Sequence, residues 1–318
     1  MRPIPGLLAF GLSTVLAAAG CAPATSPTPG AATAPPSASV PSATPSPTST
    51  PEPTVTPEPT ESLTETFPRD SFSNSTTVDN VYYPLIPGTR LTFEGQINGD
   101  EGERIPHSVV ITVTDMTKVI DGVENLIGYE LDFTAGELVE AELAFWAQDD
   151  EGTVWHMGEY PEEYEEGEIV GTPAWMAGVK EDKAGIYMKA EPRLGSLSYS
   201  QGWGPDVGWA DRARIFETGS ATCVPAGCYD DVLVTAEFNR DEPDAYQLKY
   251  YAPGIGNVRV GWAGALEKDQ EVLELVEVTK LGSEDLTKLR ATILEMEKRA
   301  YELSKDVYAG TAPIEPPG

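Results

Sequence analysis

Apolar and polar side chains alternate with a period of two in several segments of the chain, which is typical of strands with one buried face. In one segment Ala141, Leu143 and Phe145 share a face. Glu140 and Glu142 occupy the opposite face, together with Trp146. The segments expected to form strands are 90–97, 108–116, 126–133, 138–147, 153–158, 212–222, 231–238, 246–250, 257–262 and 272–278.

Short links rich in Gly, Asp and Asn connect these segments, such as Asp121-Gly122 and Ala135-Gly136. About ten strands with short connections predict an antiparallel meander. We therefore expect a mainly β fold over residues 69–280, with the sheet curved into a half-barrel or a sandwich.

A helical period replaces the strand period near the C-terminus. Ser283 is a candidate N-cap, and Leu289, Ile293, Met296 and Ala300 recur at steps of three and four. One amphipathic helix is therefore expected within residues 281–310, followed by a disordered tail at 311–318. Packing against the sheet is the favoured role of its apolar face, and a coiled coil with a partner is the alternative.

The N-terminus contains an apolar run, residues 7–16, which is too short to span a bilayer. Small residues fill positions 17–20 and precede Cys21. This arrangement resembles a bacterial lipoprotein signal peptide, here residues 1–20. The resemblance implies that the Cys21 sulfur carries a diacylglycerol, that the peptide is cut before Cys21, and that the new N-terminus is open to acylation. The alternative is an ordinary secretory signal in which Cys21 is an incidental thiol.

Residues 22–68 are dominated by Pro, Ser, Thr and Ala, with no Lys or Arg and no aromatic residue before Phe67. Such a composition cannot bury enough apolar surface to offset the entropy of ordering. With the anchor at Cys21, segment 21–68 is expected to be a disordered tether. The implied partner of Cys21 is the lipid bilayer, and the implied location is the extracytoplasmic face of the cell membrane.

The formal net charge is −30, with a sequence pI of about 4.2. This charge argues against nucleic acid and against anionic lipid headgroups as partners. It is compatible with cations or basic partners, and solubility alone is the simpler explanation.

The chain has three cysteines. If Cys21 is lipidated, Cys223 and Cys228 are left as an even pair in an oxidising compartment. They flank the turn-like segment 224–227, so we expect a disulfide that closes a hairpin. A redox or zinc motif would require a different spacing or additional ligands.

Two short motifs carry a further resemblance: Tyr-Tyr-Pro-Leu-Ile-Pro-Gly-Thr at 82–89 and Tyr-Tyr-Ala-Pro-Gly-Ile-Gly at 250–256. They resemble motifs of a recurrent family of uncharacterised secreted bacterial proteins and lipoproteins, and this resemblance implies no activity. A more distant similarity at the level of the fold is to lipoprotein carriers that hold acyl chains in a curved sheet.

Motifs of known chemistry are scarce. The sequence contains no nucleophile elbow, no nucleotide-binding loop and no zinc-protease motif, so no catalytic residue, cofactor or metal ligand is assigned. His156 is interpreted as a packed strand residue, and the glutamate run 159–168 as a solvated loop without the spacing of a calcium site. Trp203 and Trp209 lie among glycines and are candidates for a platform that binds sugar rings or a partner.

These observations favour a non-enzymatic, membrane-tethered binding or envelope protein whose ligand is hydrophobic or carbohydrate-like. The competing hypothesis is a secreted carboxylate-dependent hydrolase acting on carbohydrate. A concave apolar cavity without converging carboxylates would favour the binding protein. Two carboxyl groups in a cleft lined by tryptophan would favour the hydrolase.

Overall fold

The computed structural model describes residues 61–99 and 101–316. The signal peptide, Cys21 and most of the predicted tether therefore lie outside the described residues. Within the described part of the chain, no helix is both long enough and apolar enough to cross a membrane.

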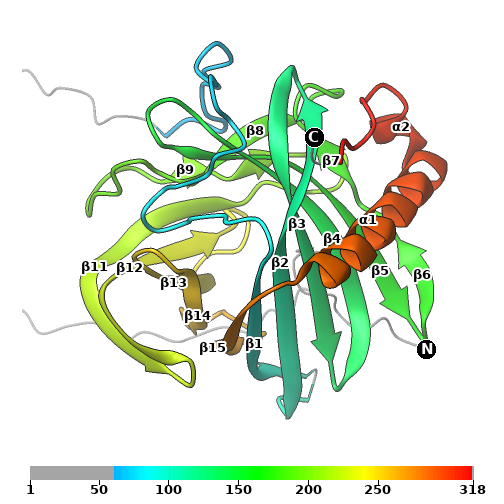
Figure 1. The fold of residues 1–318 in the computed structure, drawn as a ribbon. Coiled ribbons are helices and arrows are strands. Elements are labelled where there is room, and N and C mark those ends of the chain that lie inside the picture. Colours follow the sequence, from blue (N-terminus) through cyan, green and yellow to red (C-terminus); the bar gives the residue numbers. More distant parts are fainter. Residues whose placement is uncertain (1–60, 100, 317–318) are drawn as a thin grey trace, which may run out of the picture. The chain divides into compact units, whose positions relative to one another are not determined.

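The described residues form one 15-stranded antiparallel sheet and two helices (Figure 1). The strands are β1 (Thr89–Asn98), β2 (Arg104–Ile120), β3 (Val123–Thr134), β4 (Glu137–Gln148), β5 (Val154–Glu165), β6 (Glu168–Gly171), β7 (Trp175–Met176), β8 (Lys183–Met188), β9 (Tyr199–Ser200), β10 (Gly202–Trp203), β11 (Arg212–Val224), β12 (Gly227–Phe238), β13 (Tyr246–Ala252), β14 (Gly256–Ala263) and β15 (Val272–Lys280). The helices are α1 (Ser283–Leu303) and α2 (Lys305–Tyr308).

The mainly β, antiparallel prediction is confirmed, but the expected count of about ten strands is too low. The additional strands are β6 to β10, which have two to six residues each. Segments this short contain too few alternating positions for a period of two to be recognised.

The sheet nearly closes on itself. Its strand order is β10-β8-β5-β4-β3-β2-β1-β15-β14-β13-β12-β11-β9, with β6 and β7 paired to β5. At one end of this order β9 pairs with β11, and at the other end β10 pairs with β8. These two end strands are neighbours in the sequence. Gln201 is the single residue between them, so one bent segment joins the two edges of the rolled sheet.

Helix α1 packs on the outer face of β2 to β5 (Figure 1). Leu289, Ile293, Met296 and Ala300 are buried there against a cluster that includes Phe145. The apolar face of the helix is thus used within the chain, as favoured. The expected cap is wrong, because Gly282 is the N-cap residue and Ser283 begins the helix without a side-chain cap hydrogen bond.

Two terminal segments assigned to disorder contact the sheet or the helix. At the C-terminal end, Ile314 is buried and its amide donates to Glu297 Oε1 (2.8 Å), and Thr117 and Glu315 exchange backbone hydrogen bonds. The expectation of a disordered tail is therefore wrong for residues 311–316. The two prolines of this segment concealed the buried side chain of Ile314, which only the tertiary contacts reveal.

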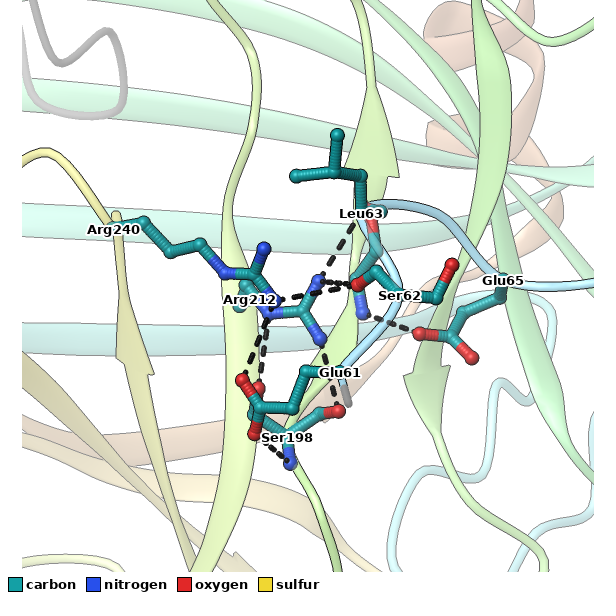
Figure 2. Close-up of polar contacts among 8 residues, drawn as sticks. Glu61, Ser62, Leu63, Glu65, Ser198, Arg212 and Arg240 are labelled. Carbon is teal, nitrogen blue, oxygen red and sulfur yellow. Dashed lines mark hydrogen bonds and ion pairs between the residues drawn. The ribbon is translucent and has the colours of Figure 1, made fainter. Parts of the chain in front are cut away.

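Residues 61–68 lie along the sheet edge formed by β9 and β11. Arg212, which is only 2% exposed, donates to the Ser62 carbonyl (2.9 Å), and Glu61 and Glu65 accept from the backbone amides of Ser198 and Ser200 (Figure 2). The ordered body thus begins before residue 69. Composition could not reveal this, because the segment is fixed by partners far away in the sequence.

Candidate functional site

A cavity of about 190 Å³ lies inside the rolled sheet. One wall is apolar and comes from β1, β2, β14 and β15. The residues of this wall are Leu91, Phe93, Val109, Ile111, Val113, Val260 and Leu273. The apolar wall gives the cavity the character of a small-molecule site.

The opposite wall is acidic. On β4, Ala141, Leu143 and Phe145 point outward into the cluster beneath α1, so the alternation directs Glu142 and Trp146 inward. Both Glu142 and Trp146 line the cavity. The polar face of a strand, which normally meets solvent, here meets an enclosed space because the helix has covered the apolar face.

A β-bulge adds two further side chains from β5. The pairing of β4 with β5 shifts between Phe145 and Trp146, opposite Gly158 and His156. Residues three apart on a regular strand face opposite sides, but this bulge turns both His156 and Glu159 into the cavity. His156 Nε2 lies 3.2 Å from Glu159 Oε1. Gly158 has a φ of 149°, and a Cβ there would lie 2.6 Å from the Trp175 carbonyl oxygen, so the bulge requires glycine.

His156 is held as a neutral ring. Its Nδ1 lies 3.2 Å from the Gln201 carbonyl oxygen, and the Trp146 ring stacks on it at 4.2 Å. Burial lowers the pKa of His156 to about 3. His156 is therefore buried in a strand, in agreement with its interpretation as a packed strand residue. Its side chain also lines the cavity.

Some of the acidic side chains have cationic or amide partners. Lys249 on β13 lies 2.8 Å from Glu237 on β12, and Gln201 Nε2 donates to the same carboxylate (2.9 Å). Burial lowers the pKa of Lys249, but the Glu237 carboxylate more than offsets this, so the pKa is raised well above its usual value. On the other side of the cavity, Glu271 lies 3.0 Å from His107 Nε2. These contacts compensate two of the buried charges.

Several other carboxyl groups of the described lining have no such cation, and three of them lie together at one end. Glu142, Glu159 and Asp211 line the main cavity, and with Trp209 they also line a smaller adjoining cavity of about 30 Å³. Among the described residues, Glu142 is only 6% exposed and has no hydrogen-bond or ion-pair partner. Glu159 accepts from the Trp175 indole (3.1 Å), and Asp211 from the Asn239 amide at 3.4 Å. These three acids and one indole form the junction between the two cavities, called here the acidic junction.

Burial dominates the protonation of the acidic junction. It raises the pKa of Glu159 to about 8 and that of Asp211 to about 7, with further contributions from neighbouring carboxylates. It also raises the pKa of Glu142 well above its usual value. Perturbed acids that converge on a cavity are typical of functional sites.

The predicted site residues are distributed unevenly. Trp209 lines the cavity and stacks near Trp175 at 6.0 Å, whereas Trp203 on β10 is not among the lining residues of the described chain. Cys223 and Cys228 are joined by a disulfide (S–S 2.08 Å) at the tip of the β11–β12 hairpin. Cys21 lies outside the described residues, so its lipidation stays a prediction.

The interpretation of the glutamate run as a solvated loop is wrong for its first half. Residues 159–165 continue strand β5, where Glu159 faces the cavity and Glu162 is fully buried against α1. Two of the three guanidinium nitrogens of Arg299 donate to Glu162, Nε at 2.8 Å and Nη2 at 2.7 Å. The composition of the run hid these roles because neither the contact with the helix nor the bulge is visible in a local pattern.

Sequence reasoning missed Glu142, Asp211, Glu237 and Lys249. A signal existed for the first and the last, because each lies on the polar side of a recognised alternating segment. That pattern did not show which side faces inward. Among the described residues, no group of three or more His, Cys, Asp or Glu side chains has the arrangement of a metal site.

No protein-family model matches the chain, and no curated protein matches it at a significant level. Two crystal structures are similar in part. One, from Bacteroides fragilis, is described as a “putative exported protein with YmcC-like fold”, with 15% identity, a TM-score of 0.38, and coverage of 63% of this chain and 100% of that one. The other is a “putative lipoprotein” from Parabacteroides distasonis, with 12% identity, a TM-score of 0.35, and coverage of 63% and 99%. At these TM-scores the likeness carries no statement about function.

Proposed function

We propose that this protein is an extracytoplasmic lipoprotein, anchored through a lipid on Cys21, that binds a small ligand with an apolar body inside its rolled sheet. The observation that carries the binding function is the cavity inside the rolled sheet, with an apolar wall from β1, β2, β14 and β15. Burying apolar ligand surface against such a wall is favourable at about 25 cal/mol per Å².

The binding function is tested with octanol, a small ligand with an apolar body. The full chain with Cys21→Ser, which cannot be lipidated, is titrated by calorimetry. Ile111→Trp places an indole in the cavity and is expected to weaken octanol binding at least tenfold. Val119→Trp changes an exposed residue of the same strand and is the matched control. Equal octanol binding by both tryptophan variants would refute the proposal, as would failure of the Cys21→Ser chain to bind octanol or any other probe with the same alkyl chain.

The anchor is tested separately by the intact mass of the protein purified from its native membrane. A chain that begins at Cys21 and carries the added mass of a diacylglyceryl group is expected. Two acyl chains supply the stable attachment that one chain does not. An unmodified cysteine, or cleavage at another position, would exclude the anchor and leave the cavity proposal untouched.

A carboxylate-dependent hydrolase acting on carbohydrate is the second candidate, because Glu159 and Asp211 lie beside Trp209 at one end of the cavity. A raised pKa suits a general acid, but a retaining or inverting mechanism also needs an ionised carboxylate. All three acids of the acidic junction have raised pKa values. Turnover of any member of a panel of p-nitrophenyl glycosides, abolished by Glu159→Gln, would replace the binding proposal with this one.

A further inference from the structure

The balance of charge around the cavity indicates the chemistry of the ligand's polar group. Lys249 is matched by Glu237, and His107 by Glu271. No described Lys or Arg forms an ion pair with an acid of the acidic junction. The cavity therefore has more lining carboxyl groups than cations, and three of the unpaired acids lie at the acidic junction.

Among the described residues, three polar groups at the acidic end have no hydrogen-bond partner: the Glu142 carboxyl group, His156 Nε2 and the Trp209 indole nitrogen. Glu142 lines both cavities and, among the described residues, accepts no hydrogen bond. His156 Nε2, also buried, has no hydrogen-bond partner, although it approaches Glu159. Buried polar groups are nearly always satisfied, and an unsatisfied one needs an explanation. A ligand group that donates hydrogen bonds would satisfy Glu142.

The aromatic rings beside these acids favour a cation over a neutral donor. Trp146 and Trp209 line the cavity on either side of His156, at ring distances of 4.2 and 5.9 Å from it, and Tyr187 completes the aromatic lining. Indole faces attract ammonium groups, and carboxylates form short, charge-assisted hydrogen bonds with them. An anionic headgroup would be repelled by these carboxylates once they are ionised.

We infer, on the basis of the proposed binding function, that the ligand is an amphiphilic organic cation whose ammonium group lies among Glu142, Glu159 and Asp211 beside the Trp209 indole. Its apolar body lies along Leu91, Val109 and Ile111. Ionised carboxylates receive the ammonium group best, so binding releases protons from the acidic junction.

The test compares three probes that share one alkyl chain and differ in the polar group: octylammonium, octanol and octanoate. Calorimetric titration of the full chain with Cys21→Ser at pH 8 is expected to give at least tenfold tighter binding of octylammonium than of the other two. Affinity for octylammonium is expected to rise between pH 6 and pH 8, while affinity for octanol is unchanged.

Two variants distinguish specific binding of the ammonium group at the acidic junction from general attraction of a cation to an acidic protein. Glu142→Gln is expected to weaken octylammonium binding at least fivefold and to leave octanol binding intact, which also shows that the variant is folded. Glu168→Gln removes the same charge from an exposed position and is expected to change neither affinity. Equal weakening by both variants would overturn the inference.

The remaining outcomes distinguish the inference from the proposed function. Octanol binding as tight as octylammonium binding would overturn the cationic ligand and leave a binding protein for neutral apolar molecules. Displacement of octylammonium by millimolar MgCl₂ or CaCl₂, but not by NaCl of equal ionic strength, would assign the acidic junction to a metal ion instead. Binding of none of the three probes would refute both proposals.

Discussion

Glu162 and Glu142 are buried glutamates on neighbouring strands of one sheet, yet their environments are opposite. Glu162 points outward from β5, is 0% exposed, and accepts hydrogen bonds from two Arg299 nitrogens and from the hydroxyls of Tyr160 and Tyr164. Glu142 points inward from β4 and has no such partner among the described residues. The outer carboxylate is part of the packed interface with α1, whereas the inner one lines the cavity.

This difference separates structural from functional burial of charge. A buried ion requires a partner to offset several kcal/mol of desolvation, and Arg299 supplies that partner on the outer face. On the inner face the protein leaves the carboxyl group uncompensated, which burial alone does not favour. We expect residues that lower stability in this way to contact a ligand.

Removal of the outer partner is expected to have the largest effect. Arg299→Met leaves Glu162 buried without its cation and should lower the free energy of unfolding by about 3 kcal/mol. Urea unfolding measures this change. Lys298→Met, an exposed neighbour on the same helix, should change stability by less than about 0.5 kcal/mol.

A second substitution tests the cause of that loss. Glu162→Gln in the Arg299→Met background removes the unpaired charge and should recover about 1 kcal/mol. If Arg299→Met and Lys298→Met are equally stable, the outer ion pair does not stabilise the interface.

The pH dependence of the ligand-free protein is the next largest effect. The pKa of Glu159 is about 8 and that of Asp211 about 7 in the folded state, above their unfolded values. The folded state therefore binds more protons than the unfolded state in this range. Stability is complete below the unfolded pKa values and is lost as the pH rises through the folded ones.

His107 acts in the same direction, because Glu271 and Asp132 outweigh burial and raise its pKa. His156 opposes the trend only below its unfolded value, since burial lowers its pKa to about 3. Between pH 6.5 and 8.5 the deprotonation of Glu159 should thus lower the free energy of unfolding by about 2 kcal/mol, and that of Asp211 by a further ~0.8 kcal/mol. Urea midpoints at the two pH values measure this, and Glu159→Gln should flatten the slope; a stability that increases with pH would contradict the buried, protonated acids.

The smallest expected effect has the opposite sign. Glu142→Gln removes the acid without a partner and should raise the free energy of unfolding of the ligand-free protein by about 1 kcal/mol at pH 8. Thermal unfolding without ligand measures the gain. Destabilisation by Glu142→Gln comparable to that of Arg299→Met would mean that the inner and outer glutamates both serve packing.

The sequence predicted the principal strands, the C-terminal helix and the pairing of Cys223 with Cys228, because each depends on local periodicity or on residue counting. The candidate site was largely missed. His156 and Glu159 share a face only through the bulge at Gly158, and Glu142 and Lys249 line the cavity only because the sheet rolls inward on their polar sides. Trp203 and Trp209 were both predicted as a ligand platform. The sequence could not show that only Trp209 of the two lines the cavity.

The sequence alone thus determined the class of the fold, the position of the helix and the expectation of an exported chain anchored at Cys21. The fold class and the helix follow from residue periods, which are properties of neighbouring residues, and the expected anchor follows from the resemblance of residues 1–21 to a lipoprotein signal peptide. Only the tertiary structure decided which face of each strand is enclosed. Helix α1 covers the apolar face of β2 to β5, so the acidic face that a single strand would present to water instead lines a cavity.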